Sequence, residues 1–287
     1  MDIIVCVKVV PASTEVRINP ETNTLMREEM ELIINPFDLY AIEEGLRLRE
    51  AHGGTVTVVT MGPPKAEAQL REALGMGCDA ALLLSARAFA GADTWATAYT
   101  LAQGIRKLGR YDLVLCGRQA IDGDTGQVGP GIAQQLGLPQ LAYVCKVREV
   151  VPPASDGDHQ PLAGTNGSRP EIGSSGRVLV ERLLEEGREV VETRLPALLT
   201  VVKDINVPRS PTPRGLRRAS RAEITVWGPA DLPDVDETAL GLDGSPTRVI
   251  RIATPDARAG TVQMMAGESV EAQAAALADL VIADGVV

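Results

Sequence analysis

Short apolar runs alternate with amphipathic stretches through most of the chain. Runs rich in β-branched and aliphatic residues predict buried strands over 3–10, 55–61, 78–84, 113–116 and 195–203. Helices are predicted between them, over 66–74, from Asp93 through Leu108, and from Val128, where apolar residues four apart share one helical face. Because strands alternate with helices, right-handed crossovers should give a parallel sheet. We therefore expect a three-layer α/β fold, a parallel sheet with helices on both faces.

The remaining segments extend this domain. Alternating residues over 141–147, 178–182 and 190–194 predict a hairpin extension. It is interrupted at 152–176 by a stretch rich in Pro, Gly, Ser and Asp, which is typical of a disordered or mobile insertion and to which we assign no function. Residues 16–27 predict a surface hairpin, and beyond Trp227 only 268–282 predicts a helix. The expected organisation is a domain over 1–226 followed by a C-terminal arm, 227–287, that packs on another protein.

Composition argues against several classes of function. The net charge of −10 and pI near 4.9 disfavour nucleic-acid binding, which needs a basic face. Four cysteines without a C-x-x-C pair, and only two histidines, argue against a zinc or iron–sulfur site. No nucleophile–base pair stands out, so no catalytic residue is predicted. With no signal peptide or apolar run of membrane-spanning length, we expect a cytoplasmic protein without direct membrane insertion.

The stretch from Leu113 to Gln140 carries the strongest functional signal. A short apolar strand leads into a polar loop, and a helix follows that is predicted to stop at Gly137. The stretch contains five closely spaced glycines: Gly117, Gly123, Gly126, Gly129 and Gly131. Exposed loop amides and a helix N-terminus favour an anion, so a nucleotide is our first hypothesis. The spacing G-x-x-G-x-x-G is neither a dinucleotide fingerprint nor a Walker A loop, and a connection without any ligand explains it equally well.

Five segments together resemble a known family. They are VCVKVVP, NPFDLYAIEEGLRLRE, LREALGMGCDAALLL, GRQAIDGDTGQVGP followed by a helix and LGLPQ, and LPALLTVVKDINVPRSPTPRG. In this order they resemble the electron transfer flavoprotein beta subunit, and the resemblance covers most of the chain apart from the insertion. It implies an electron carrier that forms a heterodimer with an alpha subunit. It also implies that the alpha subunit holds most of a shared FAD. The C-terminal arm of this chain would then wrap around the alpha subunit.

The resemblance also implies a set of cofactor-binding residues. Asn35, Pro36, Phe37 and Asp38 match positions that touch an adenine nucleotide, although a capped helix start explains them structurally. Cys6 and Met61 fall near strand ends, where core packing is an equally good explanation. The full expected set is Cys6, Asn35, Pro36, Phe37, Asp38, Met61, Gly117, Arg118, Gln119, Ala120, Ile121, Asp122, Gly123, Asp124, Thr125, Gly126, Gln127 and Val128. No metal ligand is expected.

The second nucleotide divides the family. Ordinary members hold AMP in this subunit, whereas electron-bifurcating members, and the related nitrogen-fixation type, hold a second FAD. The loop IDGDTGQVGP lacks extra residues that ordinary animal-type members carry, and together with GLDGSPT at 241–247 it resembles the bifurcating type. This favours FAD, with AMP as the alternative. Such a complex would split an electron pair from NADH between a low-potential carrier and a partner dehydrogenase.

A basic segment follows the last predicted strand. Residues 208–221 contain three prolines and five arginines, which predict an exposed, stiffened loop. A solvated basic loop without function is one interpretation. The resemblance makes 206–221 the loop that docks a partner dehydrogenase or quinone oxidoreductase. Family members often place a leucine anchor near the position of Pro213, and this chain departs from them there.

Two other classes compete with this interpretation. A universal-stress-type nucleotide-binding regulator would share this kind of sheet. That family has a glycine pair followed nine residues later by Gly-Ser or Gly-Thr, whereas here Gly126-x-x-Gly129 is followed at that distance by Pro139-Gln140. An ATP-splitting synthetase would need a Ser-Gly-Gly-x-Asp-Ser loop near the first strand, and the sequence has none there.

Overall fold

A computed structural model describes residues 1–12, 31–153, 176–250, 260 and 262–285. The hairpin predicted over 16–27 lies outside these residues, and so does the predicted insertion at 152–176 apart from residues 152, 153 and 176. The chain forms two compact units, Met1–Arg248 and Val249–Val287.

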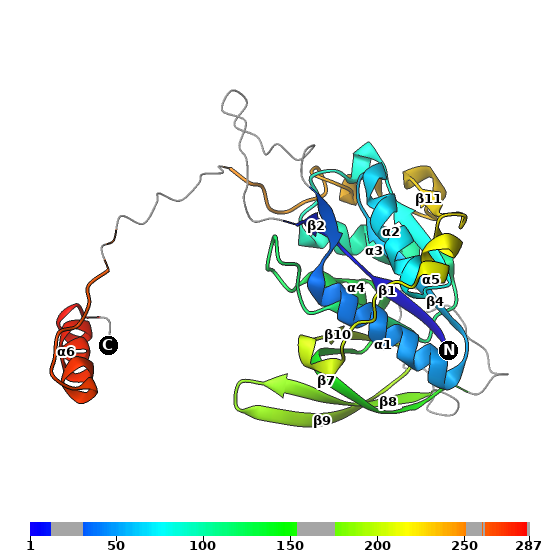
Figure 1. The fold of residues 1–287 in the computed structure, drawn as a ribbon. Coiled ribbons are helices and arrows are strands. Elements are labelled where there is room, and N and C mark those ends of the chain that lie inside the picture. The colour runs from blue at the N-terminus through cyan, green and yellow to red at the C-terminus, as the bar shows by residue number, and fades with distance from the viewer. Residues whose placement is uncertain (13–30, 154–175, 251–259, 261, 286–287) are drawn as a thin grey trace. The chain divides into compact units, whose positions relative to one another are not determined.

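The first unit is built on one large sheet (Figure 1). Its nine strands lie in the order β11-β5-β4-β1-β6-β10-β7-β8-β9. In chain order they are β1 (Asp2–Cys6), β4 (Thr55–Met61), β5 (Ala80–Leu84), β6 (Leu113–Gly117), β7 (Gln140–Val151), β8 (Arg177–Leu184), β9 (Gly187–Arg194), β10 (Ala197–Val201) and β11 (Thr225–Trp227). The strands from β11 to β7 pair in parallel, while β7, β8 and β9 form the predicted antiparallel extension.

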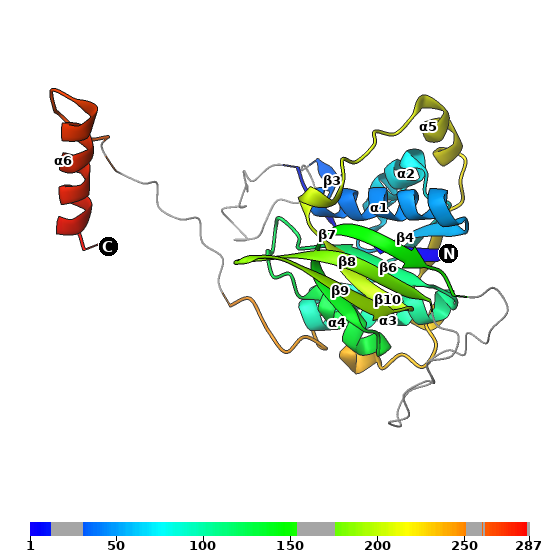
Figure 2. The same cartoon turned by 90° about the horizontal axis from the view of Figure 1, so that it is seen from below.

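Helices cover both faces of the sheet, which confirms the predicted three layers. Figure 2 shows α1 (Pro36–His52), α2 (Glu67–Met76) and α5 (Pro213–Ala219) on one face, and α3 (Thr94–Leu108) and α4 (Val128–Leu136) on the other. Alternate residues of β1 explain this, because Ile3 and Val5 pack in one core cluster while Ile4 and Cys6 pack in the other. Asp93 caps α3 as predicted, and Gly137 ends α4 in a left-handed conformation.

The single strand predicted over 3–10 is wrong. The chain leaves the large sheet after Cys6, and β2 (Val9–Pro11) instead pairs with β3 (Leu32–Ile34) in a separate two-stranded sheet. Lys8 makes the break, because its amide donates to the Asp38 carboxylate and its carbonyl accepts from the Asn35 amide. A charged residue inside an apolar run therefore marks a turn into a second sheet.

The exposed loop predicted over 208–221 is also partly wrong, because α5 occupies its second half. Thr212 caps this helix through a 2.9 Å bond from the Gly215 amide, and Pro213 stands at the start of the helix, where no amide is needed. Arg209, just before the helix, pairs with Glu43 and Glu50 of α1. The basic segment is thus held on the surface of α1 and α2.

The two strand ends that flank the insertion lie side by side in the sheet. Val151 pairs with Arg177 at the end of the β7–β8 ladder. The chain on either side of residues 152–176 is therefore tied together by the sheet itself.

The second unit contains α6 (Val270–Ala283), which confirms the helix predicted over 268–282. Ser269 caps it by accepting a bond from the Ala272 amide, and Val270, Leu277 and Ile282 are exposed. Residues 227–248, which the sequence analysis places in the expected arm of 227–287, fall in the first unit. Among the described helices, none is both long and apolar enough to cross a bilayer.

Candidate functional site

The strand order reverses at β1, and the carboxyl end of this strand is therefore the expected position of a ligand crevice. The chain moves from β1 to β4 and β5 on one side, then returns to place β6 on the other side of β1. In parallel sheets, such a reversal opens a crevice beyond the carboxyl ends of the strands. The predicted residues Cys6, Met61 and Gly117 each end one of these strands.

Asn35 holds the loop that follows β6. It precedes α1, but its side chain makes no cap bond, contrary to the capping interpretation. Instead its amide donates to the Gln119 carbonyl at 2.9 Å, and its carbonyl oxygen accepts from the Ile121 amide at 3.1 Å. Only 1% of Asn35 is exposed. Because both polar ends of a buried side chain are satisfied by one loop, Asn35 fixes the position of that loop.

Asp38 joins three segments beneath the loop. Its carboxylate accepts from the Lys8 amide at 2.6 Å and from the Gly117 amide at 3.2 Å. Burial raises the pKa of Asp38 to about 7, although the amides of Lys8 and Gly117, the Asn35 side chain and the Lys8 charge oppose this. The carboxyl therefore connects the start of α1 with the ends of β1 and β6.

Gly117 has no space for a side chain. A Cβ atom there would lie 2.3 Å from Asp38 Oδ1 and 2.7 Å from the Phe37 carbonyl carbon. Gly129 and Gly131 are also packing positions, since a Cβ would lie 2.7 Å from Thr200 Cγ2 and from Ala98 Cβ respectively. Gly123 is different, because the nearest atom to its Cβ position is Lys8 Nζ at 3.9 Å. Packing therefore explains several of the glycines but leaves Gly123 open to a ligand.

The loop from Arg118 to Gln127 presents free donors. Lys8 Nζ bonds Asp122 at 2.6 Å, and the Gln119 amide donates to Asp124, whose φ is 55°. Within the described residues, the amides of Gly123, Thr125 and Gly126 donate to no protein acceptor. Together with the N-terminus of α4 they can receive an anion such as a phosphate.

Arg118 lies among aromatic rings at the start of this loop. Its guanidinium carbon is 5.5 Å from the ring centroid of Phe37 and 5.5 Å from that of Tyr143. Its Nε donates to the Gln119 side chain at 2.6 Å, and its amide bonds the Val201 carbonyl at 2.9 Å. These contacts fix a positive charge at the edge of the crevice.

Comparison with known proteins gives a consistent answer. The electron transfer flavoprotein domain model matches residues 22–156. The electron transfer flavoprotein subunit beta of Thermoanaerobacterium thermosaccharolyticum is 49% identical, covering 91% of this chain and 92% of that protein. The chain belongs to the electron transfer flavoprotein beta subunit family. It is also 46% identical to the protein FixA of Azorhizobium caulinodans over 92% of this chain and 88% of that protein. Subunit CarD of the caffeyl-CoA reductase–Etf complex of Acetobacterium woodii is 44% identical, covering 96% of both chains.

The electron transfer flavoprotein beta subunit is an electron carrier in a flavoprotein. The structure brings the expected residues from α1 and the β6 loop directly together. Cys6 and Met61 lie at the same edge, but Cys6 is buried in the core beside Cys116 and Met61 packs partly against that core. Sequence reasoning missed Lys8 and Tyr143. The charge of Lys8 within an apolar run was an available signal, whereas Tyr143 had none.

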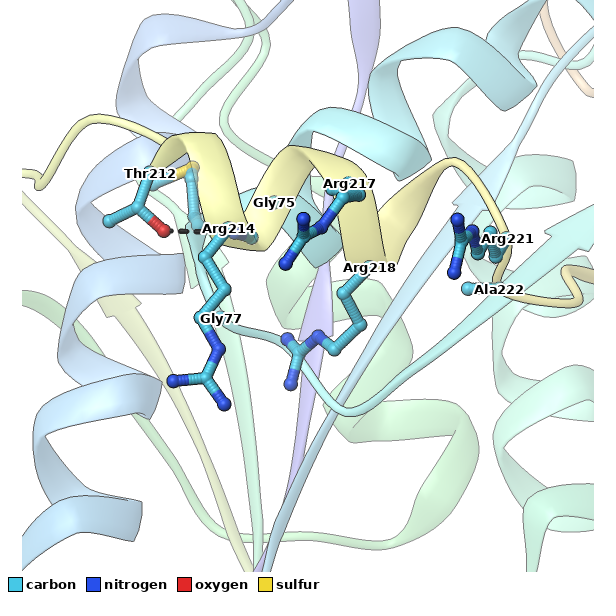
Figure 3. A pocket seen from close by; sticks show the side chains of 10 residues that line it. Gly75, Gly77, Thr212, Arg214, Arg217, Arg218, Arg221 and Ala222 are labelled. Atoms are coloured by element: carbon cyan, nitrogen blue, oxygen red, sulfur yellow. Dashed lines mark hydrogen bonds between the residues drawn. The ribbon is translucent and has the colours of Figure 1, made fainter.

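A hollow of this beta subunit lies beside α5, next to the amino end of β5, whereas the β6 loop follows the carboxyl end of its strand. It has a volume of about 740 Å³, and its lining includes Arg214, Arg217 and Arg218 of α5 together with Arg221, which lies just beyond the helix. Figure 3 shows Arg214 and Arg218 extending from the same side of α5. Arg218 donates to the carbonyls of Leu74 and Cys78, but within the described residues the other three arginines form no ion pair. The hollow borders the turn from α2 into the amino end of β5.

Proposed function

We propose that this chain binds an adenine nucleotide at the carboxyl edge of β1, β4 and β6, and passes electrons as part of a heterodimer with an alpha subunit. The observation that carries this proposal is the loop from Arg118 to Gln127. The buried Asn35 bonds this loop directly, the buried Asp38 bonds Gly117 just before it, and among the described residues the amides of Gly123, Thr125 and Gly126 have no protein acceptor. This is the arrangement that a phosphate group needs.

The proposed residues have separate tasks. Asn35 and Asp38 fix the loop and the start of α1. The amides of Gly123, Thr125 and Gly126 would bind phosphate oxygens, while Asp122, Asp124 and Gln127 can bond a ribose or an adenine edge. A flavin, when bound, supplies the one-electron and two-electron chemistry, and this chain supplies position and electrostatics.

We further propose that the second nucleotide of this subunit is FAD, as in the bifurcating type. The loop IDGDTGQVGP supports this, and so does the similarity to FixA and to CarD, whose name places it in a complex with caffeyl-CoA reductase. AMP is the alternative occupant. The exposed apolar residues of α6 support the proposal that the arm packs on the alpha subunit.

The nucleotide content of the complex tests this proposal. The chain is co-expressed with its alpha subunit, the purified complex is denatured, and released FAD and AMP are quantified per heterodimer. We expect two FAD and no AMP. One FAD with one AMP would keep the nucleotide site but reject the bifurcating type, and the absence of any nucleotide beyond the alpha-subunit FAD would reject the site.

The arginines of α5 support docking of a partner dehydrogenase through residues 206–221. They form a local positive surface on a chain with a net charge of −10. Replacing Arg214 and Arg217 by glutamate should slow association with an acidic partner about tenfold at low salt, because charge attraction accelerates encounter. Stopped-flow electron transfer between the complex and its partner measures this rate.

Salt and a matched variant separate docking from general charge. The difference should shrink at about 0.5 M salt, where the Debye length is only a few ångström. The control replaces Arg188 and Arg194 of β9 by glutamate, which changes the net charge equally outside the hollow. Equal slowing in both variants would argue against a docking role for α5.

A further inference from the structure

Tyr143 has an unusual backbone conformation. Its φ is 60°, in the left-handed region that large side chains rarely adopt. Here β7 carries one more residue than β10, since Leu141 pairs with Leu199 whereas Val144 pairs with Val201. Bulges of this kind redirect a side chain and are frequent beside functional sites. Glycine would fit this position without strain, yet the chain has tyrosine.

The surrounding contacts hold Tyr143 beside the crevice. Its amide donates to the hydroxyl of the buried Thr200 at 3.2 Å, which fixes the bulge against β10. Val144, Val201 and Gly117 lie at the same level across β7, β10 and β6, so the bulge is level with the start of the candidate loop. The Tyr143 ring meets the Arg118 guanidinium, which also meets Phe37.

Burial of the Tyr143 side chain does not offset the strain of its backbone. Tyr143 is 44% exposed, and no hydrogen bond of its hydroxyl occurs among the described residues. If this position served only the stability of the sheet, we would expect a buried side chain, or a residue such as glycine that adopts this φ without strain. The rings of Tyr143 and Phe37 both contact the Arg118 guanidinium, and part of the Tyr143 side chain stays exposed beside the crevice.

We propose that Tyr143 is a cofactor-positioning residue whose ring, fixed by the Arg118 guanidinium, packs against the planar ring system of the bound nucleotide. The inference rests on the proposed nucleotide function. A flavin ring and an adenine ring offer the same chemistry, a flat π surface, and either can stack on an aromatic side chain. The strained bulge is then the device that turns the ring toward the ligand.

Three substitutions test the proposal in the complex with the alpha subunit. Tyr143→Phe keeps the ring and should retain nucleotide like the natural chain. Tyr143→Leu keeps apolar bulk without a ring, and Tyr143→Gly removes both the ring and the strain. The Tyr143→Leu and Tyr143→Gly complexes should bind the nucleotide with an affinity about tenfold lower, which is the scale of one stacking contact. Nucleotide-depleted complex is titrated with FAD and, separately, with AMP. Loss for FAD alone identifies a flavin ring, and equal loss for both identifies adenine.

Stability separates positioning from a structural role. Tyr143→Gly should raise the unfolding midpoint while it weakens binding, a combination that a structural residue would not give. Asp234→Gly is the matched control, because Asp234 also has a positive φ, of 50°, outside the candidate site. It should raise the midpoint without changing affinity. Unchanged affinity in both Tyr143→Leu and Tyr143→Gly would overturn the inference. Failure of the natural chain to bind either nucleotide would instead overturn the proposed function.

Discussion

Replacing Gly117 by alanine should abolish nucleotide retention and destabilise the fold. The new methyl group would lie 2.3 Å from Asp38 Oδ1 and 2.8 Å from Phe37 Cβ, distances that no real contact shows. Both neighbours belong to the rigid start of α1, so the strand, the helix or the Asp38 bond must move. Overpacking of this kind costs about 1–3 kcal/mol. Urea unfolding and the nucleotide content of the purified complex measure the two effects.

Gly123→Ala provides the matched control for this prediction. Only Lys8 Nζ lies within 4 Å of the added methyl group, so the unfolding free energy should stay unchanged. If the loop approaches a phosphate group, the same methyl group should still weaken nucleotide retention. A Gly117→Ala complex with full nucleotide content would show that the loop does not need the geometry described for Asp38.

The contribution of Asp38 to the stability of the chain should fall as pH rises from about 4 to about 7. Its folded pKa of about 7 lies above the ordinary value of 3.8, so between these values the folded chain binds a proton that the unfolded chain has lost. Stability from this group is therefore complete below pH 4 and is lost as pH passes the folded pKa. At about 1.4 kcal/mol per tenfold change in the protonation equilibrium, the total is about 4 kcal/mol.

Asp38→Asn isolates this contribution. The variant cannot ionise, so the difference in unfolding free energy between it and the natural chain should change across this pH range and then level off. It should also lose stability at low pH, because one of the two amides now faces an NH2 donor. Asp204→Asn, at an exposed position outside the site, controls for the loss of a charge. A constant difference between pH 4 and pH 8 would contradict the prediction.

The periodicity of apolar residues was sufficient to predict the layers of the fold, but it did not predict where the chain turns. The spacing of Val128, Ile132 and Leu136 and the capping residue Asp93 are local signals, and local rules decide such helices. The turn at Lys8 depends on Asp38 and Asn35, which lie about thirty residues further along the chain. Prolines in the segment before α5 predict a loop unless the capping role of Thr212 is recognised.

The candidate site shows the same division. Family resemblance supplied its members, and the loop glycines supplied a hypothesis, but neither indicated why particular residues occur there. Asn35 has a good capping sequence, yet its side chain bonds a loop more than eighty residues away. The meeting of Arg118 with Tyr143 depends on strand register and on a bulge. These are long-range packing outcomes that no short window of sequence contains.

The pairing of Val151 with Arg177 has a practical consequence for protein engineering. Since β7 and β8 already bring the two ends of the insertion together, residues 152–176 close a loop whose ends the sheet fixes independently. Doubling the length of such a loop costs only about 0.6 kcal/mol in closure entropy. The position therefore suits an affinity tag, a fluorophore or a surface tether for electrode attachment, placed without a change to the strand register.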